Sequence, residues 1–117
     1  MPYVDGFVLA APKQNLEAYK AVARTAGEVW KECGALTYVE CVGDDVPVGE
    51  LTSFPRAVQA KDDEVVVFSW IVYESRESRD AVNAKVMSDP RLKHDPQAMP
   101  FDGKRMIYGG FESFLEL

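Results

Sequence analysis

A charged turn near the end of the chain carries the groups best placed for chemistry. Asp102 and Arg105 lie in the run of residues 99–111, which joins a turn to a strand containing paired glycines. An arginine in such a motif can fix an anionic or carbonyl group of a ligand through its planar set of N–H donors. The motif therefore predicts that Asp102 and Arg105 belong to a small-molecule site.

Two aromatic residues extend this predicted site. Trp70 and Tyr73 lie in the apolar run of residues 64–73, on opposite faces of an expected strand. Such side chains can line a pocket between a sheet and its helices, although aromatic residues more often fill a core. We therefore include Trp70 and Tyr73 among the predicted ligand-binding residues and keep the core role as the alternative.

Asp5 is the remaining member of the predicted ligand-binding set. It stands among apolar residues near the N-terminus, and a buried carboxylate is costly unless it is paired. We expect it either to face a subunit interface and pair with Arg79 or Arg105, or to act as an acid or base.

Metal and imidazole chemistry have less support. His94 is the only histidine, and no serine or cysteine nucleophile accompanies it, so no triad is predicted. Asp44 and Asp45 offer oxygen ligands to a divalent cation, but the run around them also reads as a solvated turn. A metal-dependent hydrolase would need these three residues to converge. We predict no metal site and no cofactor.

Composition narrows the class of protein. The 117 residues are 47 % apolar and 27 % charged, with a net charge of −6, which predicts one globular domain over residues 1–117. This acidic balance disfavours nucleic acid and anionic membranes as partners. No signal peptide or membrane-spanning run is found, so a cytoplasmic location is expected. Cys33 and Cys41 are expected to be buried thiols.

The hydrophobic periodicity predicts alternating strands and helices. Asn15 is expected to cap the first helix and Gly34 to end it. The run from Phe54 to Ala60 is expected to pair with residues 64–73 as a hairpin, or to continue the second strand beyond a bulge. The expected strands are residues 3–11, 36–42, 64–73 and 105–115; the expected helices are residues 16–33 and from Ser75 or Ser78 to about 88. This order predicts an α+β fold, the ferredoxin-like β-α-β-β-α-β pattern with an antiparallel sheet.

The strand at residues 64–73 is apolar on both faces, which predicts a homodimer. Val66 and Phe68 represent one face, and Val67 and Ile71 the other. Two helices can cover only one face of the sheet, and leaving the other in water would cost about 1.5–3 kcal/mol per side chain. A second copy packed face to face would cover it and form a dimeric α/β barrel.

Several motifs together resemble the YbaA-like family of uncharacterised bacterial proteins. They are Tyr3-Val4-Asp5-Gly6-Phe7-Val8, Gly43-Asp44-Asp45-Val46-Pro47, Phe68-Ser69-Trp70-Ile71, Arg79-Asp80, Asp89-Pro90-Arg91 and the run from Met99 to Phe111. The resemblance covers nearly the whole chain. It implies a ferredoxin-like domain of the dimeric α/β-barrel superfamily, which includes cofactor-free monooxygenases, isomerases and haem enzymes as well as proteins without known activity. The family offers no catalytic residues to carry over.

Two functions follow as hypotheses. The first is a cytoplasmic homodimer that binds a small molecule, with any chemistry being cofactor-free and of the monooxygenase or isomerase kind. The alternative is a non-enzymatic structural, stress or regulatory dimer without a ligand pocket, in which the polar motifs hold loops and subunits together.

Overall fold

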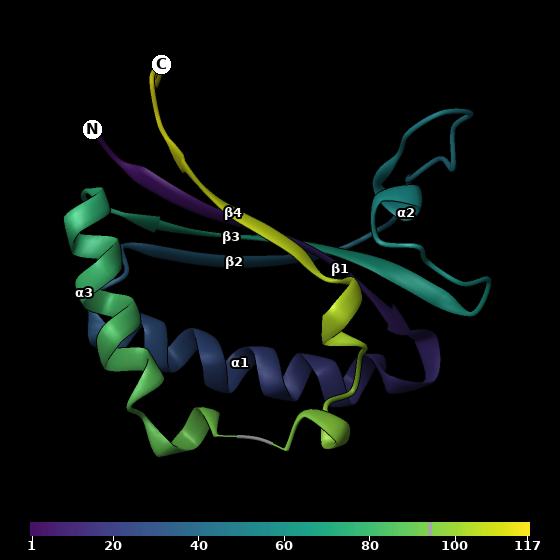
Figure 1. Cartoon of the computed structure of the whole chain (residues 1–117), viewed down its shortest axis with the longest axis horizontal. Coiled ribbons are helices and arrows are strands. Elements are labelled where there is room, and N and C mark those ends of the chain that lie inside the picture. Colours follow the sequence, from purple (N-terminus) through teal and green to yellow (C-terminus); the bar gives the residue numbers. More distant parts are fainter. Residues whose placement is uncertain (94) are drawn as a thin grey trace.

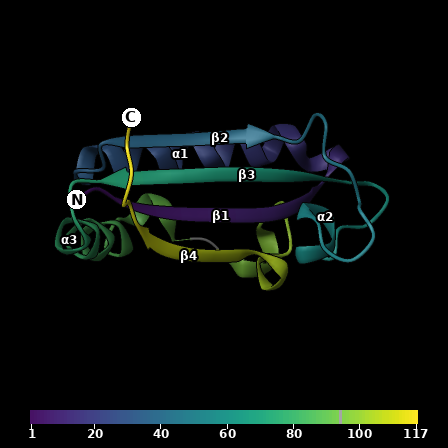
Figure 2. The same cartoon turned by 90° about the horizontal axis from the view of Figure 1, so that it is seen from above.

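The computed structural model describes residues 1–93 and 95–117, and four strands and two long helices dominate it (Figure 1). The strands form one antiparallel sheet in the order β2-β3-β1-β4 (Figure 2). The predicted α+β fold is thereby confirmed. The strands and longer helices are β1 (Tyr3–Pro12), α1 (Leu16–Cys33), β2 (Thr37–Val42), α2 (Phe54–Ala57), β3 (Glu64–Tyr73), α3 (Arg76–Met87) and β4 (Ile107–Glu112).

The pairing of β1 with β3 sets which side chains face which way. Ten residues of each strand pair, from Tyr3 opposite Tyr73 to Pro12 opposite Glu64. Because side chains alternate across a strand, the odd-numbered residues of both strands share one face and the even-numbered residues share the other. We call these the helix face and the open face of the sheet.

The helix face is covered by α1 and α3, which both lie on the same side of the sheet (Figure 1). The apolar stripe of α1 packs on the odd-numbered residues of the central strands, and Val29 is completely buried there. Gly34 ends α1 with a φ of 122°, a left-handed conformation that favours glycine, as predicted. Ser75 caps α3 by accepting a hydrogen bond from the backbone N–H of Ser78. None of the helices in the described ranges is both long and apolar enough to cross a bilayer.

The open face is covered only at one end. The segment around α2 folds back over it, and Val58 packs there against Val8, Ala10 and Val66. The hairpin predicted from Phe54 to Ala60 is therefore wrong. Ser53 caps the short helix α2 by accepting a hydrogen bond from the backbone N–H of Arg56. The proline in the first turn of α2 fits because the N–H groups of a first turn have no partner within the helix.

Three smaller expectations differ in part from the structure. Asn15 is the N-cap residue of α1, as predicted, but its side chain makes no capping hydrogen bond and donates to the Pro100 carbonyl instead. The last strand is shorter than predicted, since Arg105 lies in a 3₁₀ turn before it. Cys33 is half-buried, but Cys41 is exposed, because it lies on the open face of the edge strand β2.

The two glycines of β4 differ in what surrounds them. A Cβ atom added to Gly110 would lie 2.7 Å from a ring carbon of Tyr3, whereas one added to Gly109 would meet only Phe111, at 3.5 Å. Tyr3 is buried and is held by Arg79, whose guanidinium lies 4.9 Å from the ring centre. Gly110 is thus required by the close approach of an aromatic ring.

We predict that Gly110→Ala lowers the free energy of unfolding by about 1–3 kcal/mol, the usual cost of overpacking. Gly109→Ala is the matched control, and its effect should be neutral or slightly stabilising because alanine restricts the unfolded chain. Urea denaturation of both variants measures this difference. Equal unfolding free energies would contradict the account of Gly110.

Candidate functional site

The carboxylate of Asp5 is buried beneath the sheet. Its side chain is 8 % exposed, and Oδ1 lies 3.4 Å from Nη1 of Arg79 in α3. Arg79 is one of the two partners predicted for Asp5. The pair lies on the helix face, however, and not on the open face where a subunit interface was expected.

Three polar side chains complete a network around Asp5. The hydroxyl of Tyr73 donates to Asp5 Oδ2 at 3.0 Å and accepts from Trp30 Nε1 at 3.1 Å. Oδ1 of Asn83 lies 3.3 Å from the same indole nitrogen. Burial, followed by the charge of Asp5, raises the pKa of Tyr73 well above its usual range. The phenol therefore keeps its proton and serves as a donor.

Arg79 is only partly satisfied by its neighbours. Its Nη2 donates to the Tyr3 hydroxyl at 3.2 Å. Its Nε is buried and makes no aligned hydrogen bond within the described chain, although Asp80 Oδ1 lies 3.0 Å away. Arg79 thus joins Asp5, Tyr3 and Asp80 through different nitrogens of one guanidinium group.

A pocket of about 390 Å³ opens beside the Asp5–Arg79 pair. It lies between α3 and the strands β1 and β4, and Gly109 and Gly110 form part of its wall. Its polar lining residues are Asp5, Arg79 and Asn83, and its apolar lining includes Phe7, Trp30, Val86, Met87, Met106 and Tyr108. An apolar pocket with a few convergent polar groups is typical of small-molecule sites. We call it the Asp5–Arg79 pocket.

Arg105 is occupied by contacts within the chain. Its Nε donates to Asp102 at 3.0 Å, and its two terminal nitrogens donate to the carboxylate of Glu64 at 2.7 Å each. Nη1 also donates to the Gln59 carbonyl at 2.8 Å. This clamp holds the start of β3 against the turn before β4.

The five residues predicted to bind a ligand thus occupy three places. Asp5 and Tyr73 are in direct contact, and Asp102 and Arg105 form the separate clamp. Trp70 lies on the open face, away from the helices.

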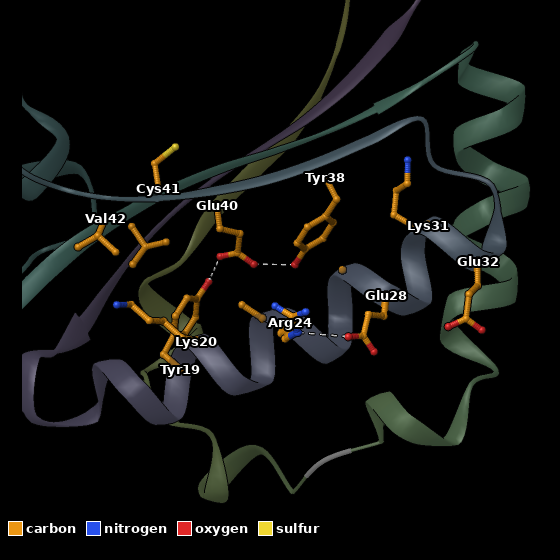
Figure 3. Close-up of a pocket in the computed structure, with 13 residues that line it drawn as sticks. Tyr19, Lys20, Arg24, Glu28, Lys31, Glu32, Tyr38, Glu40, Cys41 and Val42 are labelled. Carbon is orange, nitrogen blue, oxygen red and sulfur yellow. Dashed lines mark hydrogen bonds and ion pairs between the residues drawn. The ribbon is translucent and has the colours of Figure 1, made fainter.

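A second polar cluster lies under the edge strand β2. Glu40 points from β2 toward α1, between Tyr19 and Tyr38 (Figure 3). One carboxylate oxygen accepts the Tyr19 hydroxyl, and the other accepts the Tyr38 hydroxyl at 2.6 Å. Glu40 and the two tyrosines line both an outer groove of about 800 Å³ and an inner cavity of about 200 Å³.

Several of these polar residues were missed by sequence reasoning. Tyr19 and Trp30 were predicted only as part of the helix over residues 16–33, and Asn83 was not singled out. Glu40 could have been found from the sequence. Side chains alternate between the two faces of a strand, and Glu40 falls at a position that points toward the core, where a carboxylate is unusual.

No cluster of metal-ligating side chains is found among the described residues. Residues 1–93 and 95–117 contain no group of three His, Cys, Asp or Glu side chains that could hold a metal ion. Asp44 and Asp45 lie in an exposed loop. His94 lies outside the described residues, so the hydrolase hypothesis that depends on it receives no support here.

Comparison with known sequences gives a family match over most of the chain. A family described as "Protein of unknown function (DUF1428)" matches residues 2–103. The uncharacterised protein YbaA of Escherichia coli K12 is 57 % identical over 116 residues, which is 99 % of each chain. The YbaA protein of Shigella flexneri is equally similar.

Solved structures share the fold at low sequence identity. Rv0793 from Mycobacterium tuberculosis aligns with a TM-score of 0.60 and 14 % identity, covering 99 % of this chain and 98 % of the other. A dimeric ferredoxin-like protein from an uncultured marine organism aligns with a TM-score of 0.56 and 13 % identity over the full length of both chains. These similarities establish a ferredoxin-like fold.

The Arg105 clamp predicts a specific loss of stability in acid. Hydrogen bonds from Arg105 lower the pKa of Glu64 from 4.5 to about 2. Because the folded pKa is depressed, the stabilisation is complete above pH 4.5 and is lost as the pH falls toward 2. At about 1.4 kcal/mol per pKa unit, this amounts to roughly 3 kcal/mol.

Glu64→Gln should remove this part of the pH dependence, leaving the free energy of unfolding flatter between pH 4.5 and 2. Glu50→Gln, on an exposed loop, serves as the control and should keep the wild-type slope. Denaturant titrations at several pH values measure both. A Glu64→Gln variant with the wild-type slope would show that the clamp does not hold an ionised Glu64.

Proposed function

The chain belongs to the DUF1428 family of proteins of unknown function, and we propose that it is a homodimer that binds a small molecule in the Asp5–Arg79 pocket. The observation that carries the proposal is the ion pair at the wall of that pocket, in which the carboxylate of Asp5 is buried. Buried charges are costly, and a pocket beside them is a good place for a polar ligand group.

The charges of the pocket favour a neutral ligand with a carbonyl group. Asp5 and Arg79 together carry no net charge, and Asp80 adds a negative charge 3.0 Å from Arg79 Nε, so a carboxylate ligand would gain from Arg79 but would be repelled by both aspartates. A carbonyl oxygen can accept from Arg79 without that penalty, and an N–H or O–H group on the ligand can donate to Asp5. The rings of Phe7 and Trp30 suit a flat apolar body.

The same groups suit proton transfer next to a carbonyl. Asp5 is positioned as the base, and Arg79 as the cation that stabilises the charge developing on the ligand oxygen. Of the cofactor-free reactions implied by the family resemblance, isomerisation is the kind that this arrangement favours.

The open face supplies the surface for a second copy. Phe68, Ile107 and Phe111 are 41 %, 45 % and 64 % exposed there, beside the half-buried Trp70. Apolar side chains gathered on one face of a sheet favour a two-fold contact between identical surfaces. The solved structure described as a dimeric ferredoxin-like protein supports a dimer for this fold. The free thiols Cys33 and Cys41 support a cytoplasmic location.

One observation favours the alternative, a structural dimer without a ligand. Arg79 contacts both Asp5 and Tyr3, and so ties α3 to β1 whether or not the pocket is filled. A structural dimer does not require the pocket to prefer any class of ligand, whereas the first proposal does.

We predict that benzamide, which offers a carbonyl oxygen and an N–H donor on a flat ring, binds the protein more tightly than benzoate. Arg79→Lys should weaken benzamide binding about tenfold, because lysine keeps the charge opposite Asp5 but lacks the planar fork of donors. Saturation-transfer NMR with each compound measures the two affinities.

Arg76→Lys is the matched control on the same helix, since Arg76 is exposed and does not line the pocket. It should bind benzamide like the wild type. Equal affinity in Arg79→Lys and Arg76→Lys, or no preference for benzamide over benzoate, would contradict the ligand proposal.

The dimer proposal predicts different effects for two aromatic residues of β4. Phe111→Asp should raise the dimer dissociation constant at least about thirtyfold, since it places a charge in an apolar interface at a cost of about 2 kcal/mol. Tyr108→Asp lies on the helix face of the same strand and should leave the dimer intact. Sedimentation equilibrium measures both. A wild-type monomer, or a Phe111→Asp dimer of unchanged affinity, would contradict the predicted interface.

A further inference from the structure

A cavity of about 200 Å³ lies between α1 and the sheet, next to the Asp5–Arg79 pocket. Met99, Phe101 and Met106 close it on the side of the turn before β4. Among the described residues that line it, Glu40 is the only charged one. Five of the lining residues are aromatic: Phe7, Tyr19, Trp30, Tyr38 and Phe101.

Glu40 has the contacts of an ionised carboxylate. Both of its oxygens accept hydrogen bonds from phenols, those of Tyr19 and Tyr38. Burial, followed by the hydrogen bond to Glu40, raises the pKa of each phenol well above its usual range, so both tyrosines stay protonated and donate. No Lys or Arg in the described chain forms an ion pair with Glu40. The charge of the carboxylate is therefore not neutralised by direct contact, although Lys20, Arg24 and Lys31 line the outer groove that Glu40 shares.

The aromatic rings stand in two pairs around this carboxylate. Tyr19 meets Phe101 edge to face, with ring centres 5.5 Å apart, and Tyr38 meets Trp30 at a tilt, with ring centres 6.1 Å apart. The two hydroxyl contacts with Glu40 join the pairs (Figure 3). Aromatic faces attract cations, most strongly where water is excluded. A carboxylate in a cavity lined by five aromatic residues is suited to a positive ligand group.

The packing of α1 preserves this arrangement. Gly27 lies in the interior of α1, where glycine costs about 1 kcal/mol relative to alanine. A Cβ atom at this position would lie 2.8 Å from a ring carbon of Tyr38. The glycine thus allows the Tyr38 ring to rest against the helix while its hydroxyl reaches Glu40.

We propose that Glu40 and the surrounding aromatic rings bind a compact organic cation, a tertiary or quaternary ammonium group. The cavity is smaller than the roughly 300–1,000 Å³ of sites for larger ligands, so it takes a head group and not a whole extended molecule. The methyl groups of such a cation contact the rings, and its charge is neutralised by Glu40.

The outer groove offers room for the rest of the ligand. This groove of about 800 Å³ shares Tyr19, Tyr38 and Glu40 with the inner cavity and runs along the surface of α1. A substituent on the ammonium group can extend into it past Lys20 and Arg24. The ligand class is therefore a small ammonium compound with a polar tail.

Isothermal titration with choline, and with its uncharged carbon isostere 3,3-dimethyl-1-butanol, tests this site. We expect choline to bind at least about tenfold more tightly than the isostere, because only choline gains from the charge of Glu40. Glu40→Gln keeps the size and an acceptor oxygen but removes the charge. It should weaken choline binding about tenfold and leave binding of the isostere unchanged.

Glu17→Gln is the matched control, since Glu17 is exposed in the first turn of α1 and lines neither the cavity nor the groove. It should bind choline like the wild type. The proposal is overturned if the wild type binds the isostere as tightly as choline or does not bind choline, or if Glu40→Gln keeps the wild-type affinity for choline. Should Glu40→Gln fail to fold, the comparison of choline with its isostere on the wild type decides alone.

The binding tests of the Glu40 site and of the Asp5–Arg79 pocket are independent of each other. Choline binding should be unaffected by Arg79→Lys, and benzamide binding should be unaffected by Glu40→Gln. Either ligand proposal can therefore be contradicted while the other stands.

Discussion

The ten-residue antiparallel pairing of β1 with β3 is the constraint on which the rest of the structure depends. It aligns two apolar strands at the centre of the sheet and assigns every side chain to one of two faces. The chain supplies two long helices, and both cover the same face. One apolar face is thereby sealed within the subunit, while the other keeps large side chains such as Phe68 in contact with solvent. The proposed dimer would cover the second face, and both proposed ligand sites lie on the first.

Polar groups on the helix face distinguish the two candidate sites. Asp5 and Glu40 both lie between sheet and helices, but their surroundings differ. Asp5 faces the cation of Arg79, so its pocket is balanced in charge. Glu40 receives only neutral phenols within the described chain, so its cavity keeps a negative charge. The same layer thus offers two sites of different electrostatic character, separated by shared apolar walls that include Trp30.

The sequence was sufficient to predict the elements but not the contacts between them. The stripe of α1 and the two apolar faces of β3 follow from periodicity, and Asp5 was recognisable as a polar residue in an apolar strand. The contact of Trp30 with Tyr73 was not predictable, because it joins residues 43 positions apart and depends on where α1 crosses the sheet. The short helix α2 was read as a strand, because its apolar residues match a strand pattern and its cap at Ser53 was overlooked.

The two tryptophans allow one measurement of the central claim, that the helix face binds ligand and the open face binds a second copy. The chain contains only Trp30 and Trp70, so labelling with 5-fluorotryptophan should give two fluorine NMR signals, assigned by replacing each residue with phenylalanine. We expect benzamide or choline to move only the Trp30 signal, and dilution through the dimer dissociation range to move only the Trp70 signal. A Trp70 signal that follows ligand, or a Trp30 signal that follows dilution alone, would contradict this division of the sheet into two faces.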